Sequence, residues 1–171
     1  NGKTILENAK DFSKTALVVI TRLGGEGTDL PFKQIKNDTG TKNYAGASDC
    51  VIDTTRTYLD ISTEEEDMLK MVRENFEKVV VIVNSCNEMN LSFLEDYNID
   101  ACLTMNGLGE NGAYAIPSLL RGYKYELNKE TNKKEKVLLS PSGKSASIHV
   151  YDLATNPSFV NAGGKTANNG Y

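Results

Sequence analysis

Glu26 stands between Gly25 and Gly27, shortly after an apolar segment rich in β-branched residues. Neighbouring glycines remove side-chain bulk and allow backbone conformations with positive φ, so a ligand can approach the carboxyl group closely. A carboxyl group held in this way at the end of a buried strand suits proton donation to a leaving group. The alternative is an ordinary solvated glutamate in a loop. Arg22 and Asp29 flank the same loop and are candidates for contact with a substrate, or for an ion pair that holds the loop.

A second glycine-rich turn, Gly107-Leu-Gly-Glu-Asn-Gly112, matches the G-x-G-x-x-G pattern of dinucleotide-binding loops. Three features argue against that interpretation. The turn would follow the third strand instead of the first, and Pro117 interrupts the helix soon after it. The segment about 20 residues later, where a ribose-binding acid is needed, is rich in lysine. We therefore interpret it as a tight structural turn and expect no cofactor.

Other reactive residue types give weaker signals. Gly163-Gly-Lys-Thr166 resembles the end of a phosphate-binding loop, but Phe159 stands where the first glycine of that motif belongs. His149 is the only histidine, so no nucleophile has an evident basic partner. Cys86 and Cys102 lie on or beside apolar segments, and we predict that both are buried structural thiols. The three cysteines show no metal-ligand spacing, so we expect no metal site.

The apolar periodicity predicts the elements that carry these loops. Helices are expected over residues 5–12, 62–76 and 91–97 and after the turn at 107–112, with Ser62 and Glu65 forming a capping box. Strands are expected over residues 15–21, 78–84 and 99–105, and the first two are apolar on both faces. This alternation predicts an α/β fold, a flavodoxin-like three-layer α/β/α sandwich with a mostly parallel sheet. Ligands bind such sheets at the carboxyl ends of the strands, where both glycine-rich loops lie.

Two segments interrupt the alternation. Residues 30–60 are too long for an ordinary connection, and we predict a long irregular loop near the rim of the site. Residues 123–136 are strongly polar and are predicted to form an exposed loop or hairpin. The 171 residues suit one domain, and we expect residues 1–171 to be a single, partial α/β-sandwich domain of a larger protein.

The charge and hydropathy of the chain exclude some partners. The net charge is −4, and the lysines near residues 129–136 are interleaved with glutamates. No basic patch is evident, so we do not expect nucleic acid as a partner. No apolar run approaches the length that crosses a bilayer, so we do not expect a membrane partner.

Several segments, taken in order, resemble glycoside hydrolase family 3. Residues 16–29 resemble the strand and the S/G-G-E-G-x-D-R segment of that family, and Tyr58-Leu-Asp-Ile-Ser62 resembles its Y-L-x-L-S/T segment. Residues 79–89 resemble its V-I-V-V-L-N-S-G-x-P-M strand. Further matches are the turn at 107–113, with its family pattern G-x-x-G-Q-x-G-A, and Ser140-Pro-Ser-Gly-Lys144, with its N-P-S-G-K/R signature. The sequence departs from the family at Leu30, where arginine is usual, and at Glu110, where glutamine is usual.

The resemblance implies that Glu26 is the general acid/base of a retaining exo-β-glycosidase that resembles the β-glucosidases. It also implies that a (β/α)8 barrel domain of the same protein supplies the nucleophilic aspartate, and that the substrate is a β-glycoside. We therefore expect the chain by itself to be inactive.

Two other classes of function stay open. A flavodoxin-like module that binds a partner without catalysis would explain the missing nucleophile and the long segment at 30–60. A nucleotide-dependent enzyme would use the turn at 107–112, and nucleotide would then raise its melting temperature.

Overall fold

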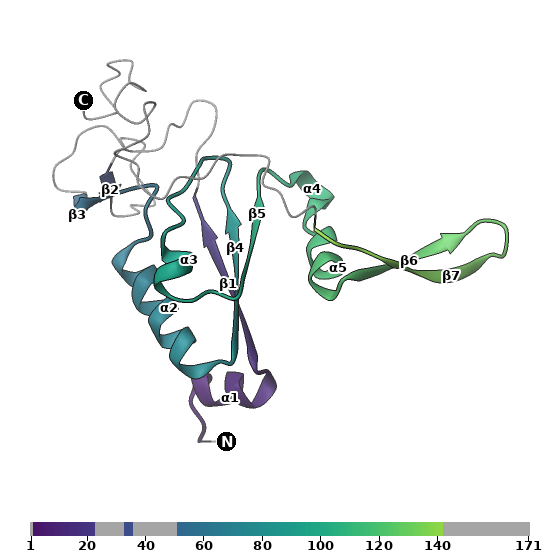
Figure 1. Cartoon of the computed structure of the whole chain (residues 1–171), viewed down its shortest axis with the longest axis horizontal. Helices are drawn as coiled ribbons and strands as arrows, with labels where there is room; N and C mark the ends of the chain where they lie inside the picture. Colours follow the sequence, from purple (N-terminus) through teal and green to yellow (C-terminus); the bar gives the residue numbers. More distant parts are fainter. Residues whose placement is uncertain (1, 23–32, 36–50, 142–171) are drawn as a thin grey trace, which may run out of the picture. The chain divides into compact units, whose positions relative to one another are not determined.

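The computed structural model describes residues 2–22, 33–35 and 51–141, and it places them in two compact units (Figure 1). The described residues up to Asn106 belong to the first unit, and the second unit begins at Gly107. The boundary between the two units falls at the glycine-rich turn. The reason is local: the chain after this turn forms a hairpin whose strands contact each other and the adjacent helix.

The first unit contains a parallel sheet of three strands in the order β1-β4-β5. These are β1 (Thr15–Thr21), β4 (Lys78–Asn84) and β5 (Ala101–Met105). Val18 pairs with Val81, and Val81 pairs with Cys102, so the three strands run in step. The parallel sheet with helical connections confirms the predicted α/β class.

Three helices accompany this sheet: α1 (Ile5–Phe12), α2 (Thr63–Asn75) and α3 (Phe93–Asp96). The strand order advances in one direction from β1 to β5, and crossover connections between parallel strands are right-handed. Both α2 and α3 must therefore lie on the same face of the sheet, as Figure 1 shows. The core of that face combines strand and helix residues: Val18, Ile20, Val79, Val81, Val83, Leu69, Val72 and Phe93.

The opposite face of β1 differs from the prediction of a strand buried on both sides. Leu17 is 51% exposed and Val19 is 54% exposed, whereas Ile82 beside them in β4 is 2% exposed. Because α2 and α3 share one face, no helix of the first unit's described part covers Leu17 and Val19. Only the central strand β4 is buried on both faces as expected.

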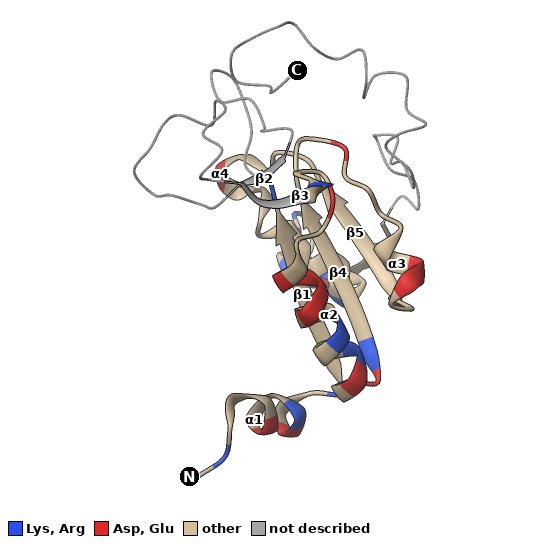
Figure 2. Ribbon diagram, turned by 90° about the vertical axis from the view of Figure 1, so that its left-hand side faces the viewer, with Lys and Arg blue, Asp and Glu red and all other residues tan. Residues whose placement is uncertain are grey.

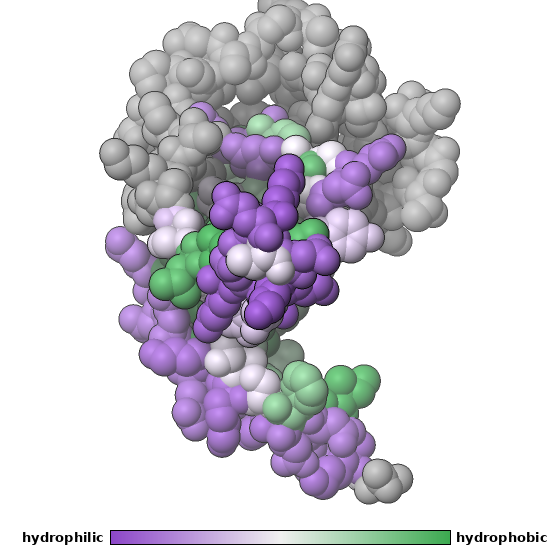
Figure 3. Space-filling view, turned by 90° about the vertical axis from the view of Figure 1, so that its right-hand side faces the viewer, coloured by the Kyte–Doolittle hydropathy of each residue, from purple (hydrophilic) through white to green (hydrophobic). Residues whose placement is uncertain are grey.

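The apolar side chains of α1 are also largely exposed. Thr4 and Glu7 form a capping box that begins this helix, but the helix buries no residue. Ile5 is 91% exposed and Phe12 is 90% exposed. Figure 3 shows hydrophobic side chains gathered at the end of the molecule where α1 lies.

Residues 30–60 are not wholly irregular, which corrects the sequence prediction. Within them, β2 (Lys33–Ile35) and β3 (Val51–Thr57) pair in an antiparallel sheet with shifts in register. The polar sequence of β3, Val-Ile-Asp-Thr-Thr-Arg-Thr, lacks a strong apolar alternation, which is why the strand was not expected. Threonine and valine nevertheless favour extended backbone.

The second unit consists of α4 (Gly109–Gly112), α5 (Ala115–Arg121), β6 (Tyr123–Asn128) and β7 (Lys133–Leu138). Strands β6 and β7 pair in an antiparallel hairpin, from Tyr123 opposite Leu138 to Asn128 opposite Lys133. The hairpin was one of the two structures expected for this polar segment. The Tyr123 ring lies against the Lys136 ammonium group and the Arg121 guanidinium, at 4.3 Å and 5.5 Å from the ring centroid.

Candidate active site

The structure describes one of the three predicted site residues. Arg22 follows β1 directly, at the carboxyl end of the parallel sheet. Glu26 and Asp29 lie outside the described residues, so their roles stay predictions. The described part of the candidate site consists of Arg22 and the residues that contact it, at the point where the chain leaves β1.

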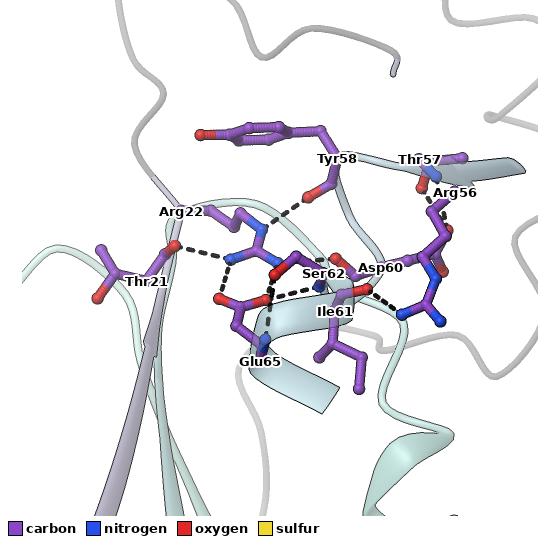
Figure 4. Close-up of polar contacts among 9 residues, drawn as sticks. All are labelled: Thr21, Arg22, Arg56, Thr57, Tyr58, Asp60, Ile61, Ser62 and Glu65. Atoms are coloured by element: carbon purple, nitrogen blue, oxygen red, sulfur yellow. Dashed lines mark hydrogen bonds and ion pairs between the residues drawn. The ribbon is translucent and has the colours of Figure 1, made fainter. Parts of the chain in front are cut away.

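All five N–H groups of the Arg22 guanidinium donate hydrogen bonds to protein oxygens (Figure 4). Two of them form a fork with the Glu65 carboxylate: Nη1 to Oε1 at 2.8 Å and Nη2 to Oε2 at 2.7 Å. The others reach three backbone carbonyls, those of Tyr58 at 2.7 Å, Asp60 at 2.7 Å and Thr21 at 2.9 Å. We call this set of contacts the Arg22–Glu65 clasp.

The clasp is largely withdrawn from water. The Arg22 side chain is 8% exposed and that of Glu65 is 21% exposed. The Tyr58 ring adds a cation–π contact, 5.4 Å from the guanidinium carbon. A guanidinium loses its hydration when buried, and forked hydrogen bonds to a carboxylate are the arrangement that best compensates that loss. Because every donor is used within the protein, the geometry favours the loop-holding ion pair for Arg22 over direct contact with a substrate.

Glu65 joins this clasp to the beginning of α2. Its carboxylate accepts a hydrogen bond from the Ser62 backbone N–H at 2.8 Å, while its own N–H donates to Ser62 Oγ at 3.2 Å. Burial acts to raise the pKa of Glu65, but the hydrogen bonds from Arg22 and Ser62 outweigh it and lower the pKa. The helix also begins with Glu64, Glu65 and Glu66 and has Arg73 in its last turn, an order that suits the helix dipole (Figure 2).

The sequence identified Glu65 as part of a capping box with Ser62 but did not identify Arg22 as the partner of the Glu65 carboxylate. Arg22 and Glu65 are 43 residues apart, and no local spacing rule connects positions at that separation. The carbonyl acceptors of Tyr58 and Asp60 could not be predicted from the sequence either, because every residue type has a backbone carbonyl. Only the packing of α2 against β1 brings these groups together.

The turn between β3 and α2 is itself held by side chains. Asp60 Oδ2 accepts hydrogen bonds from the backbone N–H and the hydroxyl of Thr57, at 2.8 and 2.9 Å. Asp60 Oδ1 accepts one from the Asn90 side chain at 2.9 Å, and the Asn90 N–H donates to the Leu59 carbonyl. The carbonyls that Arg22 uses therefore belong to a braced segment, so the clasp connects two fixed parts of the fold.

A second charged cluster surrounds Glu66 on the next position of α2. Its carboxylate accepts hydrogen bonds from Arg56 and from the Tyr97 hydroxyl at 2.6 Å, and it pairs with Lys70 at 2.7 Å. These contacts, with Lys70 the largest, lower the pKa of Glu66 to about 2. A carboxyl group with so low a pKa stays ionised at neutral pH and cannot donate a proton there.

The Glu66 cluster lies beside an open pocket of about 330 Å³. Acidic, basic, aromatic and aliphatic side chains line it: Arg56, Asp60, Ile61, Glu66, Phe93, Asp96 and Tyr97. Burial and the hydrogen bond to Glu66 raise the pKa of Tyr97. The contacts made by Glu66 give this cluster a structural role in joining β3, α2 and α3.

The structure around the turn at 107–112 argues against nucleotide binding. Gly107 and Gly109 have positive φ, 61° and 62°, which explains glycine at both positions. The helix α4 lies within this turn and has only four residues. After α5 the chain enters the antiparallel hairpin instead of a further parallel strand. A dinucleotide site needs such a strand to carry its ribose-binding acid.

The two described cysteines differ from each other. Cys102 is half-buried, and burial raises the pKa of its thiol to about 11. Cys86 is exposed, so the prediction of a buried thiol is wrong at this position. Cys86 lies two residues beyond Asn84, the last residue of β4, and is therefore outside the strand.

Among the residues that the structure describes, no three histidine, cysteine, aspartate or glutamate side chains are grouped in a way that could hold a metal ion. None of the helices in this described part has the length and apolar character needed to cross a membrane.

The chain is similar to parts of two β-glucosidases, although no family model matches it. It is 29% identical over 121 residues to Beta-glucosidase A of Butyrivibrio fibrisolvens, a match that covers 69% of this chain and 14% of that protein. It is 25% identical over 158 residues to a Beta-glucosidase of Ruminococcus albus, covering 92% of this chain and 13% of that protein. The chain therefore spans about one seventh of the length of the curated relatives it matches.

Proposed function

We propose that this chain is the acid/base-bearing domain of a retaining exo-β-glycosidase of glycoside hydrolase family 3, similar to the β-glucosidases. The observation that carries the proposal is the match to the Ruminococcus albus protein. A match of 158 residues within a chain of 171 necessarily spans residue 26. The α/β fold adds support, because the Gly-Gly-Glu-Gly segment leaves the carboxyl end of a parallel strand, the edge at which such sheets bind ligands.

In the proposed mechanism, Glu26 protonates the oxygen of the departing group while a second carboxylate attacks the anomeric carbon. Glu26 then acts as the base that activates water to release the sugar. Retaining glycosidases hold the two carboxyl groups about 5–5.5 Å apart. The nucleophile would come from a (β/α)8 barrel domain of the same protein. Docking of that domain and of the sugar would desolvate Glu26 and raise its pKa, as proton donation requires.

Two further parts of the chain have proposed roles near Glu26. Asp29 is a candidate to accept hydrogen bonds from sugar hydroxyl groups, since it lies three residues further along the same segment. Residues 30–60 follow directly and would shape the side of the site that receives the leaving group.

The test is hydrolysis of aryl β-glucosides by the full-length protein with Glu26 replaced by alanine. Loss of the general acid/base is expected to lower kcat by about 10²–10⁴-fold. Azide should restore part of the rate on a substrate with a good leaving group. As an anionic nucleophile it attacks the anomeric carbon of the glycosyl-enzyme without deprotonation by a base, displaces the enzyme carboxylate and releases a glycosyl azide. Unchanged activity in Glu26→Ala would leave this residue an ordinary loop glutamate and would favour the binding module.

Glu110→Ala is the matched control. Like Glu26, Glu110 stands in a glycine-rich segment of the sequence after a parallel strand, and its own side chain is exposed. Its loss should change kcat by less than about 3-fold and should not respond to azide, because exposed surface changes have small effects. Azide rescue of Glu110→Ala in place of Glu26→Ala would move the acid/base to the other turn.

A further inference from the structure

Arg22 is the last described residue before the segment that carries Glu26, and it is held at both its backbone and its side chain. Its backbone N–H donates to the Asn84 carbonyl at 3.2 Å, which extends the β1–β4 pairing one residue beyond β1. Its side chain is fixed by the five hydrogen bonds of the clasp, four of which reach groups outside β1. The chain thus enters residues 23–32 from a rigid point four residues before Glu26.

We propose that Arg22 and Glu65 are positioning residues for the acid/base: the Arg22–Glu65 clasp sets the place from which the Glu26 segment leaves the sheet. This inference rests on the proposed function. A general acid must be held within a few tenths of an ångström of the oxygen it protonates, so the segment that carries it needs a fixed origin. The clasp provides that origin without contacting the substrate.

The chemistry of the clasp requires arginine. Lysine keeps the positive charge but offers three hydrogens on a single nitrogen, which cannot fork to a carboxylate and also reach three separate carbonyls. Arg22→Lys therefore loosens the clasp while keeping the charge. Glu65→Gln loosens it from the other side, since glutamine keeps the shape of glutamate but lacks the charge.

Arg73 offers a matched control at the opposite end of the strands, near the amino ends of β4 and β5. Its guanidinium donates to Asp100 at 2.8 Å and to the carbonyls of Asn98, Phe76 and Glu77 at 2.7–3.1 Å. Asp100 in turn accepts a hydrogen bond from the Val79 N–H, near the amino ends of β4 and β5. Arg73→Lys thus weakens a similar ion pair, which lies far from the carboxyl ends of the strands, where Glu26 would act.

The experiment measures kcat/KM of the full-length protein on aryl β-glucosides that range from 2,4-dinitrophenyl, a good leaving group, to unsubstituted phenyl, a poor one. Only poor leaving groups need protonation as the bond breaks. Arg22→Lys and Glu65→Gln should lower kcat/KM by about 10–100-fold for phenyl and by less than about 3-fold for dinitrophenyl. Arg73→Lys should affect all substrates to the same small extent, below about 3-fold.

The outcomes separate this inference from the proposed function. If Glu26→Ala shows the steep dependence on leaving group but Arg22→Lys and Glu65→Gln do not, the positioning role is wrong and the proposed function stands. If Glu26→Ala shows no such dependence, the proposed function itself is wrong. Thermal unfolding of each variant identifies those that are unfolded at the assay temperature. If Arg22→Lys is unfolded there, the result for Glu65→Gln tests the positioning role.

Discussion

Arg22, Arg56 and Arg73 stabilise this fold in the same way, by joining backbone carbonyls to a carboxylate. Each guanidinium donates to at least one carbonyl and one acidic side chain, and the acidic partners are Glu65, Glu66 and Asp100. A planar group with five donors can satisfy several acceptors at once, which an ammonium group cannot do. Replacement of these arginines by lysine is therefore not conservative, although it preserves the charge.

Glu66 leads to a prediction about pH. Hydrogen bonds from Lys70, Tyr97 and Arg56 lower its pKa from 4.5 to about 2. A carboxyl group whose pKa is lower in the folded state stabilises the fold above its unfolded pKa, and this contribution is lost as the pH falls through the folded value. The wild-type chain should therefore lose free energy of unfolding between about pH 4.5 and pH 2, and Glu66→Gln should lose less over that window.

The measurement is urea denaturation at a series of pH values. Glu64→Gln is the control, because Glu64 is an exposed neighbour in the same turn of α2 and the change in size is identical. Its acid profile should run parallel to that of the wild type. Parallel profiles for Glu66→Gln and wild type would contradict the role assigned to the Glu66 contacts.

At the scale of elements, the strands of the parallel sheet were predictable because their composition is strongly apolar and β-branched. The predicted bounds of β1 and β4 agree with the structure, and β5 begins two residues later than expected. The exposure of Leu17 and Val19 was not predictable. It depends on the order of the strands, which directs α2 and α3 to one face, and strand order is not encoded in the hydropathy of β1.

Capping of α2 leads to a prediction at this scale. Ser62→Ala removes the hydroxyl that accepts from the Glu65 N–H, and it should lower the free energy of unfolding by about 1 kcal/mol. The loss should be global because α2 buries Leu69 and Val72 in the core. Chemical denaturation followed by circular dichroism measures it.

Thr4→Ala is the matched control for this helix cap. Thr4 forms the same type of capping box, but α1 buries no residue. Its loss should increase amide hydrogen exchange in α1 and change the global unfolding less than Ser62→Ala does. An equal effect of the two substitutions on global unfolding would mean that α1 belongs to the same cooperative unit as α2.

At the scale of the whole molecule, charge is distributed unevenly along the chain. Residues 121–138 carry six lysine or arginine residues and three glutamates, a net charge of +3, while the full chain has a net charge of −4. The remainder is therefore clearly acidic. The basic hairpin belongs to the second unit, so the two units differ in charge as well as in architecture.

The proposed function predicts that residues 1–171 alone do not hydrolyse β-glycosides. The second carboxylate of a retaining mechanism would come from another domain, so Glu26 would lack its nucleophilic partner. Aryl β-glucosides at high enzyme concentration provide the measurement, with the full-length protein as the positive control. Turnover by the chain that is abolished in Glu26→Ala would show that the nucleophile lies within these residues.

The sequence by itself determined the α/β class, the strands β1 and β4 and the capping box of α2. These features depend on composition and on contacts between residues three or four positions apart, so they can be read along the chain. It also singled out Glu26 and Asp29, which lie outside the described residues, so their roles are still predictions.

Only the tertiary structure decided that Arg22 is enclosed by Glu65, Tyr58 and Asp60, that β1 is open on one face and that Cys86 is exposed. Each of these depends on which segments meet in space. Residues such as Arg22 and Glu65, 43 positions apart, meet because right-handed crossovers and core packing bring α2 against β1. The spacing of residues along the sequence does not predict a contact of this kind.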